Sequence, residues 1–436
     1  MVEKVIFDPA NASRLLAVGG SSRRWNQSEA FGWVWESTDG GRKWRHLTTL
    51  FEIGSVPDAK KGVNIVAAEF AAGKLGLAYV VADGVGVFVS RDSGRTWEKS
   101  ATFPARNAHR MAVHPSKPET LWVCTGPEVK PGESAHSPGG VFRSDDAGKT
   151  WVSIIGDLPQ EKGDGYKFTA GFEAMAVSPA DPDVIWVNDH RWNTGVIYRT
   201  ENGGKHWKPV ATKQNVGQAD NDAAHKALRT TARIETATPA GLSLAGLAAD
   251  PRDPLVVYGF NTEFLLRTRD GGATWTDITA LRPDPKKPDH WRGRGWTGWC
   301  STNIGFNPYR DGQAVVQAMD AGRVWISDNG FKTFRYPARE PNPRGGGNDI
   351  TFTKDGAIFA TTGQSGQFNG ILRSGDGGAT FETLSGEKRG LPEAGWEKGA
   401  GRRGHLCPPR RLQARLGRPR RQAHAIHRRW RDLVAL

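Results

Sequence analysis

The octet Ser144-Asp145-Asp146-Ala147-Gly148-Lys149-Thr150-Trp151 decides how the rest of this sequence is organised. It reads Ser-x-Asp-x-Gly-x-Thr-Trp, and six further stretches repeat the pattern with small changes. The seven copies occupy residues 37–44, 90–97, 144–151, 200–207, 268–275, 327–334 and 374–381. Their closing aromatic residues are 53, 54, 56, 68, 59 and 47 residues apart. A signature that returns about every 50 residues indicates a repeat architecture.

Each octet has the chemistry of a turn. The Asp or Asn at the third position can accept hydrogen bonds from nearby backbone N–H groups, and the Gly two positions later permits a positive φ. The first Ser or Thr can add a hydroxyl bond across the turn. The closing aromatic residue starts the next strand and buries a large apolar side chain. We therefore expect each octet to form the tip of a β-hairpin.

The stretches around the octets read as short strands. Around the third octet these β-rich runs are 110–115, 120–125, 140–144 and 152–155, separated by Pro, Gly and Ser turn signals. Four strands in each of seven units predict an all-β, seven-bladed β-propeller over residues 1–385, because a single blade cannot bury both of its faces. The expected blades are residues 2–48, 62–100, 109–156, 172–212, 243–279, 302–337 and 348–384.

Composition sets broad limits on the chain. It is 37% hydrophobic and 24% charged, which is enough for a substantial core, and no apolar run is long enough to span a membrane. The first residues show no signal-peptide pattern, so we expect either a cytoplasmic chain or a leader lost when the start was assigned. Three cysteines make no disulfide framework, and Cys124 is expected to be a small buried residue.

The basic charge is concentrated at the C-terminal end. Residues 402–436 hold eleven Arg and one acidic residue, which accounts for +10 of the net charge of +13. The body of the chain is therefore not a basic binder of nucleic acid. One interpretation of the irregular stretch 386–436 is a disordered basic tail. The other is a reading-frame error, because shifting the codons of 421–433 by one base permits Gly-Lys-Leu-Thr-Arg-Tyr-Thr-Asp-Gly-Gly-Glu-Thr-Trp, and we hypothesise a frameshifted eighth blade there.

The octets and the order of the strands resemble the Asp-box, or bacterial neuraminidase repeat, propellers. That group includes sialidases, twin-propeller xyloglucan-active endoglucanases, sortilin-type receptors and a photosystem assembly factor. The resemblance covers residues 1 to about 385, and it implies a fold far more specifically than an activity. It also implies that ligands bind on the face opposite the octets, and it favours an extracellular or periplasmic location.

Two aspartates are the candidate catalytic residues. The stretches around Asp83 (Val81-Ala-Asp-Gly-Val-Gly86) and Asp320 (Ala318-Met-Asp-Ala-Gly322) look like the Thr-Asp-Val-Gly-Gly-Val-Tyr stretch of the xyloglucan-active endoglucanases, which carries a catalytic Asp. An inverting glycosidase uses two carboxyl groups about 6.5–9.5 Å apart, one as acid and one as base. In that family the pair is divided between two facing propellers. The alternative is that Asp83 and Asp320 are ordinary strand-end turn residues.

Tryptophans outside the octets are the candidate substrate-binding residues. A Gly-rich, Arg-containing loop holds Trp291, Trp296 and Trp299, whose flat apolar faces beside donors suit stacking on sugar rings. The alternative is that two of the three pack beneath the loop. Trp25, next to Arg23 and Arg24, forms a similar but weaker set, and Trp192 lies in another loop between a second and a third strand.

Several other functions are disfavoured. A sialidase would need an Arg-Ile-Pro stretch, which is missing, and a nucleophilic Tyr, whereas Tyr198 and Tyr258 fall within expected strands. The run 147–150 ends like a phosphate-binding loop, but Arg143 stands where the first Gly is needed. The octets lack the trailing Glu of a calcium loop, and no His or Cys set has metal-ligand spacing, so we expect no cofactor and no metal.

Two classes of function remain open. The first is a carbohydrate-active glycoside hydrolase, xyloglucanase-like and inverting, or an inactive relative, with a polysaccharide or glycan as its partner. The second is a non-catalytic propeller that binds a protein or a glycan, or that serves in assembly.

Overall fold

The computed structural model of the chain describes residues 2–19, 32–51, 64–130, 132–191, 196–211, 246–260, 265–277, 282–284, 287–292, 299–319, 324–335, 337–338, 347–362 and 370–391. The chain divides into two units, Met1–Lys398 and Gly399–Leu436. The first unit contains all of the described residues. The tail from residue 392 onward, with the expected eighth octet, lies outside them.

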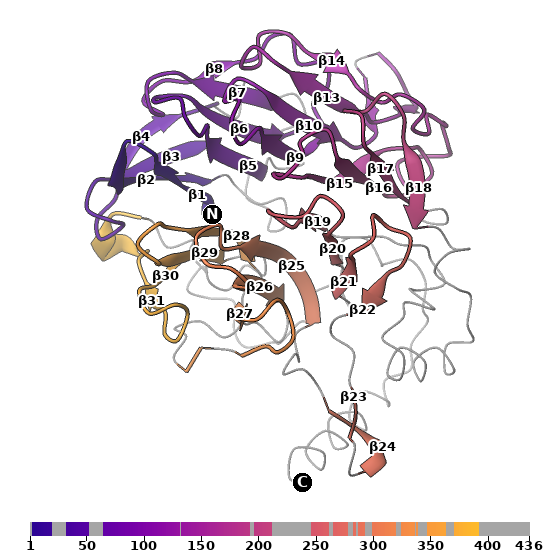
Figure 1. Cartoon of the computed structure of the whole chain (residues 1–436). Helices are drawn as coiled ribbons and strands as arrows, with labels where there is room; N and C mark the ends of the chain where they lie inside the picture. Colours follow the sequence, from indigo (N-terminus) through magenta and orange to yellow (C-terminus); the bar gives the residue numbers. More distant parts are fainter. Residues whose placement is uncertain are drawn as a thin grey trace, which may run out of the picture. The chain divides into compact units, whose positions relative to one another are not determined.

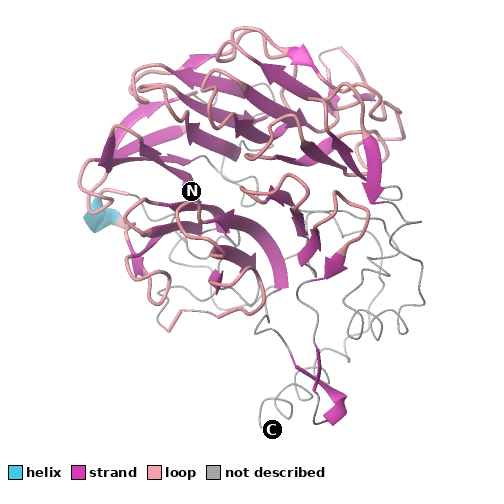
Figure 2. Cartoon of the chain, in the orientation of Figure 1, coloured by secondary structure: helices cyan, strands magenta, loops and turns pink. Residues whose placement is uncertain are grey.

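The prediction of an all-β, seven-bladed propeller is confirmed. Seven antiparallel sheets follow one another along the chain (Figures 1 and 2), and in each the strands are hydrogen-bonded in chain order. The first three blades are β1 (Val2–Asp8), β2 (Asn11–Gly19), β3 (Trp33–Ser37) and β4 (Arg45–Thr49); β5 (Asn64–Phe70), β6 (Ala78–Asp83), β7 (Gly86–Ser90) and β8 (Glu98–Lys99); β9 (Ala108–Val113), β10 (Leu121–Thr125), β13 (Val141–Ser144) and β14 (Val152–Ser153).

The fourth, fifth and seventh blades also have four strands each. They are β15 (Phe172–Val177), β16 (Ile185–Asp189), β17 (Ile197–Thr200) and β18 (Lys208–Ala211); β19 (Gly246–Ala249), β20 (Val257–Phe260), β21 (Leu265–Thr268) and β22 (Thr276–Asp277); β28 (Gly347–Phe352), β29 (Ile358–Thr362), β30 (Gly370–Ser374) and β31 (Glu382–Thr383). The sixth blade consists of β25 (Trp299–Phe306), β26 (Ala314–Met319) and β27 (Val324–Ser327). A bridge between Ile326 and Arg335 marks the place of its fourth strand.

Three further elements lie outside the blades. They are the hairpin of β11 (Glu128–Val129) and β12 (His136–Ser137), the hairpin of β23 (Arg282–Asp284) and β24 (Lys287–Arg292), and the 3-10 helix η3 (Glu387–Arg389). The first of these hairpins interrupts the connection between β10 and β13 in the third blade, and it therefore enlarges a loop on the face opposite the octets.

Each octet connects the third and fourth strands of its blade, as predicted. In the third octet Ser144 Oγ donates to Asp146 Oδ1 at 2.8 Å and accepts from Gly148 N at 2.8 Å. Asp146 in turn accepts from Thr150 N at 2.8 Å and from Thr150 Oγ1 at 2.6 Å. The hydroxyl and the carboxylate therefore satisfy the backbone groups of a turn in which both the fourth and the fifth residue have positive φ.

The fifth residue of the octet is also where neighbouring blades meet. A Cβ on Gly204 would lie 2.7 Å from the backbone oxygen of Ile154 in the preceding blade, and one on Gly272 would lie 2.5 Å from Val210 Cβ. The octet's closing indole reaches across the same boundary. Indole N–H groups donate to backbone oxygens of the preceding blade from Trp207 to Ile154, from Trp275 to Val210, and from Trp44 to Leu384. The octets thus fix both the turn and the spacing of the blades.

The sixth octet departs from this pattern at Phe331. This residue takes the position of the second glycine, with φ of 65°, and its ring is 1% exposed. The ring packs 4.7 Å from Tyr258 of the fifth blade and 6.0 Å from Phe306, measured between ring centroids. A large aromatic side chain here fills the boundary that glycine leaves narrow in the other octets.

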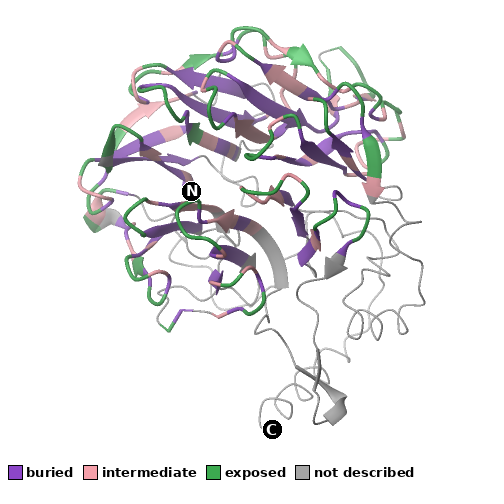
Figure 3. Cartoon of the chain, in the orientation of Figure 1, coloured by how far each residue is buried: buried purple, intermediate pink, exposed green. Residues whose placement is uncertain are grey.

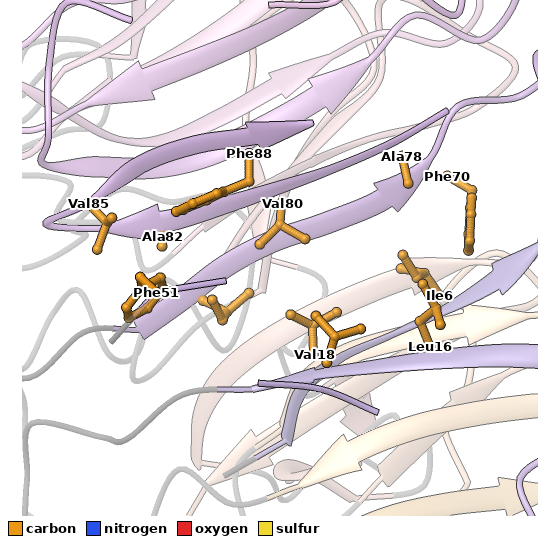
Figure 4. Close-up of a cluster of buried hydrophobic side chains, with 12 residues drawn as sticks. Ile6, Leu16, Val18, Phe51, Phe70, Ala78, Val80, Ala82, Val85 and Phe88 are labelled. Atoms are coloured by element: carbon orange, nitrogen blue, oxygen red, sulfur yellow. The ribbon is translucent and has the colours of Figure 1, made fainter. Parts of the chain in front are cut away.

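The hydrophobic core consists of clusters between neighbouring blades. Central strands such as β6 are buried, whereas fourth strands such as β8 and β14 and many turns are exposed (Figure 3). Between the first and second blades, Ile6, Leu16 and Val18 face Val80 and Ala82 (Figure 4). Because each blade faces two neighbours, both faces of a central strand such as β6 are buried, and its burial is continuous rather than alternating.

The ring closes between the seventh blade and the first. The strand β28 contacts β1, and Lys4 Nζ lies 3.2 Å from Asp349 Oδ1. Beyond β31, Leu384 and Leu391 are buried in one cluster with Trp44. Trp44 N donates to Arg389 O at 2.7 Å. The described residues therefore close the propeller with seven blades.

Candidate functional site

Asp83 is the one predicted catalytic residue that the structure describes. It ends β6, at the connection to the third strand of its blade, which lies at the end of the blade opposite the octet. Its side chain is 5% exposed. Asp320 lies outside the described residues, so the spacing of the two carboxyl groups stays a prediction.

Only two of the five predicted substrate-binding tryptophans lie among the described residues. Trp25, Trp192 and Trp296 lie outside the described residues. Trp291 falls within β24, and Trp299 begins β25. The two strand positions place Trp291 in the hairpin before the sixth blade and Trp299 at the entry to its innermost strand.

A partly buried polar cluster surrounds Tyr166, close to Asp83. The Tyr166 hydroxyl donates to Glu173 Oε1 at 2.5 Å and lies 3.4 Å from His109 Nε2. Burial, and then the charge of Glu173, raise the pKa of Tyr166 above its usual range, and the charge of Asp83 adds to this shift. Asp83 and Glu173 therefore lie within electrostatic reach of one phenol, which keeps its proton.

The residues of this cluster lie on the face of the propeller that carries the loops between blades. His109 is the second residue of β9, the first strand of the third blade, and Glu173 is the second residue of β15, the first strand of the fourth, each at a β-bulge. Bulges redirect a side chain at the end of a strand. Tyr166 comes from the connection between these two blades, and its ring lies 5.0 Å from that of His190, between centroids.

Hydrogen bonds join the loops of the second and third blades into one surface. Gly84 N, next to Asp83, donates to Arg106 O at 2.7 Å. Glu128 Oε2 accepts from the backbone N–H groups of Arg106 at 2.8 Å and of Asn107 at 3.2 Å. The β11–β12 hairpin is thereby fastened beside the Asp83 loop.

Gly126 has to be a glycine for this surface to form. A Cβ there would lie 2.7 Å from His109 Nε2, 2.9 Å from the Tyr166 hydroxyl and 3.0 Å from Asn107 Nδ2. The backbone of Gly126 therefore covers the polar cluster directly, and a side chain would displace it.

A separate cleft of the described residues lies elsewhere. It has a volume of about 260 Å³ and sits between the first and seventh blades, at the octet end. Its walls include Asp39, Arg42, Asp355, Phe359 and Arg373. This cleft is at the opposite end of the propeller from Asp83, and it holds none of the predicted site residues.

Sequence reasoning missed the cluster around Tyr166. The candidate site loops join a second to a third strand, as the loops that hold His136 and His190 do. The connection that contains Tyr166 was not among them. The signal that could have found it is the run Gly163-Asp-Gly-Tyr-Lys-Phe168, in which two aromatic residues stand in a Gly-rich connection on the loop face.

The polar groups near Asp83 suit proton transfer rather than metal binding. Two carboxylates, a phenol and imidazoles can donate, accept and move protons. Over the described ranges, no group of three or more His, Cys, Asp or Glu residues is placed to hold a metal ion. The same ranges contain no helix long and apolar enough to cross a membrane.

Comparisons with known proteins point to polysaccharide-degrading enzymes. No protein-family model matches the chain. It is 24% identical over 287 residues to a probable oligoxyloglucan-reducing end-specific xyloglucanase of Neosartorya fischeri, covering 49% of this chain and 33% of that protein. It is 24% identical over 316 residues to a xyloglucanase of a Paenibacillus species, covering 64% of this chain and 26% of that protein.

Two solved structures that align with the chain are a xyloglucanase and a protein named YCF48. A GH74 xyloglucanase from Xanthomonas campestris aligns with a TM-score of 0.43 and 19% identity, over 88% of this chain and 67% of the other. YCF48 from Cyanidioschyzon merolae aligns with a TM-score of 0.45 and 19% identity, over 73% of this chain and 84% of the other. The chain spans about a quarter to a third of the length of the curated relatives given above. The chain is thus a seven-bladed propeller that is similar in sequence to xyloglucanases. The similarity extends across about half of its length in one case and nearly two thirds in the other.

Proposed function

We propose that this chain is the Asp-box propeller of a carbohydrate-active glycoside hydrolase that cleaves xyloglucan with inversion. The observation that carries the proposal is the sequence similarity to xyloglucanases, which extends over 49% of the chain in one case and 64% in another. The seven octets support the Asp-box assignment, because their hydroxyl, carboxylate and glycine positions play the parts that the pattern predicts.

The position of Asp83 supports its part in the reaction. It stands at a strand end on the loop face, where propellers and other rigid scaffolds carry their variable functional loops. Its carboxyl group is buried beside the polar cluster of Tyr166 rather than open to bulk water. The hydrogen bond from Gly84 N to Arg106 O holds the loop in place.

The proposed reaction needs two carboxyl groups, Asp83 and Asp320. One protonates the glycosidic oxygen as the bond from the anomeric carbon to that oxygen breaks. The other takes a proton from water, whose oxygen attacks the anomeric carbon from the opposite side. The products are a new reducing end of inverted configuration and a free sugar hydroxyl. Trp25, Trp192, Trp291, Trp296 and Trp299 are the proposed stacking residues for the substrate.

A panel of polysaccharides tests this function. The purified chain is incubated with xyloglucan, mixed-linkage β-glucan, carboxymethylcellulose and starch, and new reducing ends are measured beside retardation in native gels containing each polymer. The proposal expects reducing ends and retardation with xyloglucan. Retardation without reducing ends would replace it with a non-catalytic glycan-binding propeller, and neither effect with any polymer would overturn it.

A further inference from the structure

Phe168 is an exposed aromatic side chain on the same face as Asp83. It is 46% exposed, and it belongs to the connection between the third and fourth blades. Within the described ranges the other strongly exposed aromatic residue is Tyr309, at 56%, which lies on the turn between β25 and β26 at the octet end. Single exposed apolar residues are common, so the surroundings of Phe168 decide its meaning.

The backbone on either side of Phe168 is held firmly. Phe168 N and Thr169 N both donate to Gly165 O, at 3.3 and 3.2 Å. Thr169 Oγ1 donates to Gly165 O at 2.9 Å, and Ala170 N donates to Glu161 O at 2.9 Å. Thr169 and Ala170 are both fully buried. The loop 161–171 is therefore held by its own hydrogen bonds, while the side chain of Phe168 stays exposed.

The fourth blade holds this loop from the side. His190 Nδ1 lies 3.0 Å from Gly171 O, and His190 Nε2 lies 3.0 Å from Tyr166 O. Arg191 joins the loop as well, with its guanidinium 3.1 Å from Glu161 and 2.7 Å from Asp189. The aromatic ring is thus displayed by an anchored loop, and binding to it costs little ordering of the backbone.

The loop also connects Phe168 with the candidate reaction site. Tyr166 precedes Phe168 by two residues and belongs to the cluster that feels the charge of Asp83. Glu161, Lys162 and Asp164, which precede Phe168 in the same loop, have exposed polar side chains. A pyranose ring presents one apolar C–H face and a rim of hydroxyl groups, so it matches a flat aromatic face on a loop that also carries charged donors and acceptors.

We propose that Phe168 is a stacking platform for a pyranose ring of the polysaccharide chain, outside the bond that is cleaved. This inference rests on the proposed function and adds a binding subsite to it. The subsite lies on the connection between the third and fourth blades. It gives the polysaccharide a contact on the loop face that is separate from the Asp83 loop.

Native affinity gels with xyloglucan test the platform. The proposal expects Phe168→Ala to weaken retention about 2- to 12-fold, which corresponds to the aromatic contribution of about 0.5–1.5 kcal/mol. Phe168→Trp should retain or strengthen it. Tyr309→Ala is the matched control, because it removes an exposed aromatic ring from the octet end, and it should bind as the unchanged protein does. Since Phe168 is exposed, its variants should keep the melting temperature of the unchanged protein.

The outcomes separate the platform from the proposed function. Retention of the unchanged protein together with equal retention of Phe168→Ala overturns the platform and leaves the proposed function standing. Equal weakening by Phe168→Ala and Tyr309→Ala also overturns it, because the effect would not be specific to the loop face. If the unchanged protein is not retained by any of the polymers, the platform falls, and the proposed function falls with it only when no new reducing ends appear either.

Discussion

Replacing Gly204 with Ala tests the conclusion that the fifth residue of each octet sets the spacing of the blades. Gly204 has φ of 95°, where an L-residue costs about 1–2 kcal/mol. Its Cβ would lie 2.7 Å from Ile154 O and 2.8 Å from Ile154 Cβ. Inserting a methyl group into a closed interface costs a further amount of about 1–3 kcal/mol. Since a backbone oxygen cannot rotate away, we expect the free energy of unfolding to fall by about 3 kcal/mol or more.

Gly40 provides the matched control. It has φ of 71°, but a Cβ there would meet no atom within 4 Å. The same position of other octets already holds Ser93, with φ of 63°, and Ala147, with φ of 58°. Gly40→Ala therefore carries the backbone penalty alone, and we expect a loss of about 1 kcal/mol.

Urea unfolding followed by tryptophan fluorescence compares the two variants. The unfolding midpoint should fall in the order unchanged protein, Gly40→Ala, Gly204→Ala, with equal denaturant slopes. Equal midpoints for the two variants would refute the reasoning, because they would show that the contact between blades adds nothing to the backbone penalty.

Two further predictions concern the octets. Although partial burial of Asp146 opposes the shift, hydrogen bonds from Thr150, Ser144 and Lys149 lower its pKa to about 2. Its contribution to stability is therefore present above about pH 4 and is lost as the pH falls toward 2. Asp146→Asn, which introduces the residue type that Asn202 and Asn329 supply in other octets, should remove part of this acid sensitivity in melting curves from pH 7 to 2; an unchanged curve would contradict the assignment. Phe331→Ala should cost about 3–5 kcal/mol in urea unfolding, because the buried ring leaves a cavity against Tyr258; a loss below about 1 kcal/mol would show that this boundary closes without it.

The octets made the fold predictable. Seven copies of one turn signature, with short β-rich runs between them, were enough to predict seven blades and to place each octet between a third and a fourth strand. The turn chemistry is local, since each hydrogen bond joins residues within four positions of each other. Local chemistry of this kind can be read from sequence because no distant partner is needed.

Contacts between blades were less predictable, because they pair residues about 50 positions apart or more. Phe331 in a glycine position is one example. Within a blade, the cross-strand pairing of an Arg before the octet with an aromatic residue of the second strand was not predicted either. Arg143 lies over Trp122, with 5.6 Å from the guanidinium to the ring centroid, and Arg199 lies over Trp186 at 5.1 Å. The sequence contains these residues, but their pairing follows only from the strand register.

The candidate site shows the same contrast between features that are local in sequence and features that depend on distant residues. Asp83 could be proposed from its local stretch, because a strand followed by Asp-Gly is visible in the sequence. Tyr166, Glu173 and His109 could not, because one connection and two strands of different blades bring them together, and both strand positions depend on β-bulges. Burial confirms the expectation for Cys124, since its thiol is fully buried and burial raises its pKa to about 12.

The most direct test of the proposed function is to measure xyloglucan hydrolysis and xyloglucan binding side by side for Asp83→Asn and the unchanged protein. Asp253→Asn, which alters an exposed turn residue at the octet end, is the control. We predict that Asp83→Asn loses about 100-fold or more of the hydrolysis rate while its retention in xyloglucan gels changes less than about 2-fold. Hydrolysis by Asp83→Asn at the rate of the unchanged protein would contradict the assignment of Asp83 as a catalytic acid or base.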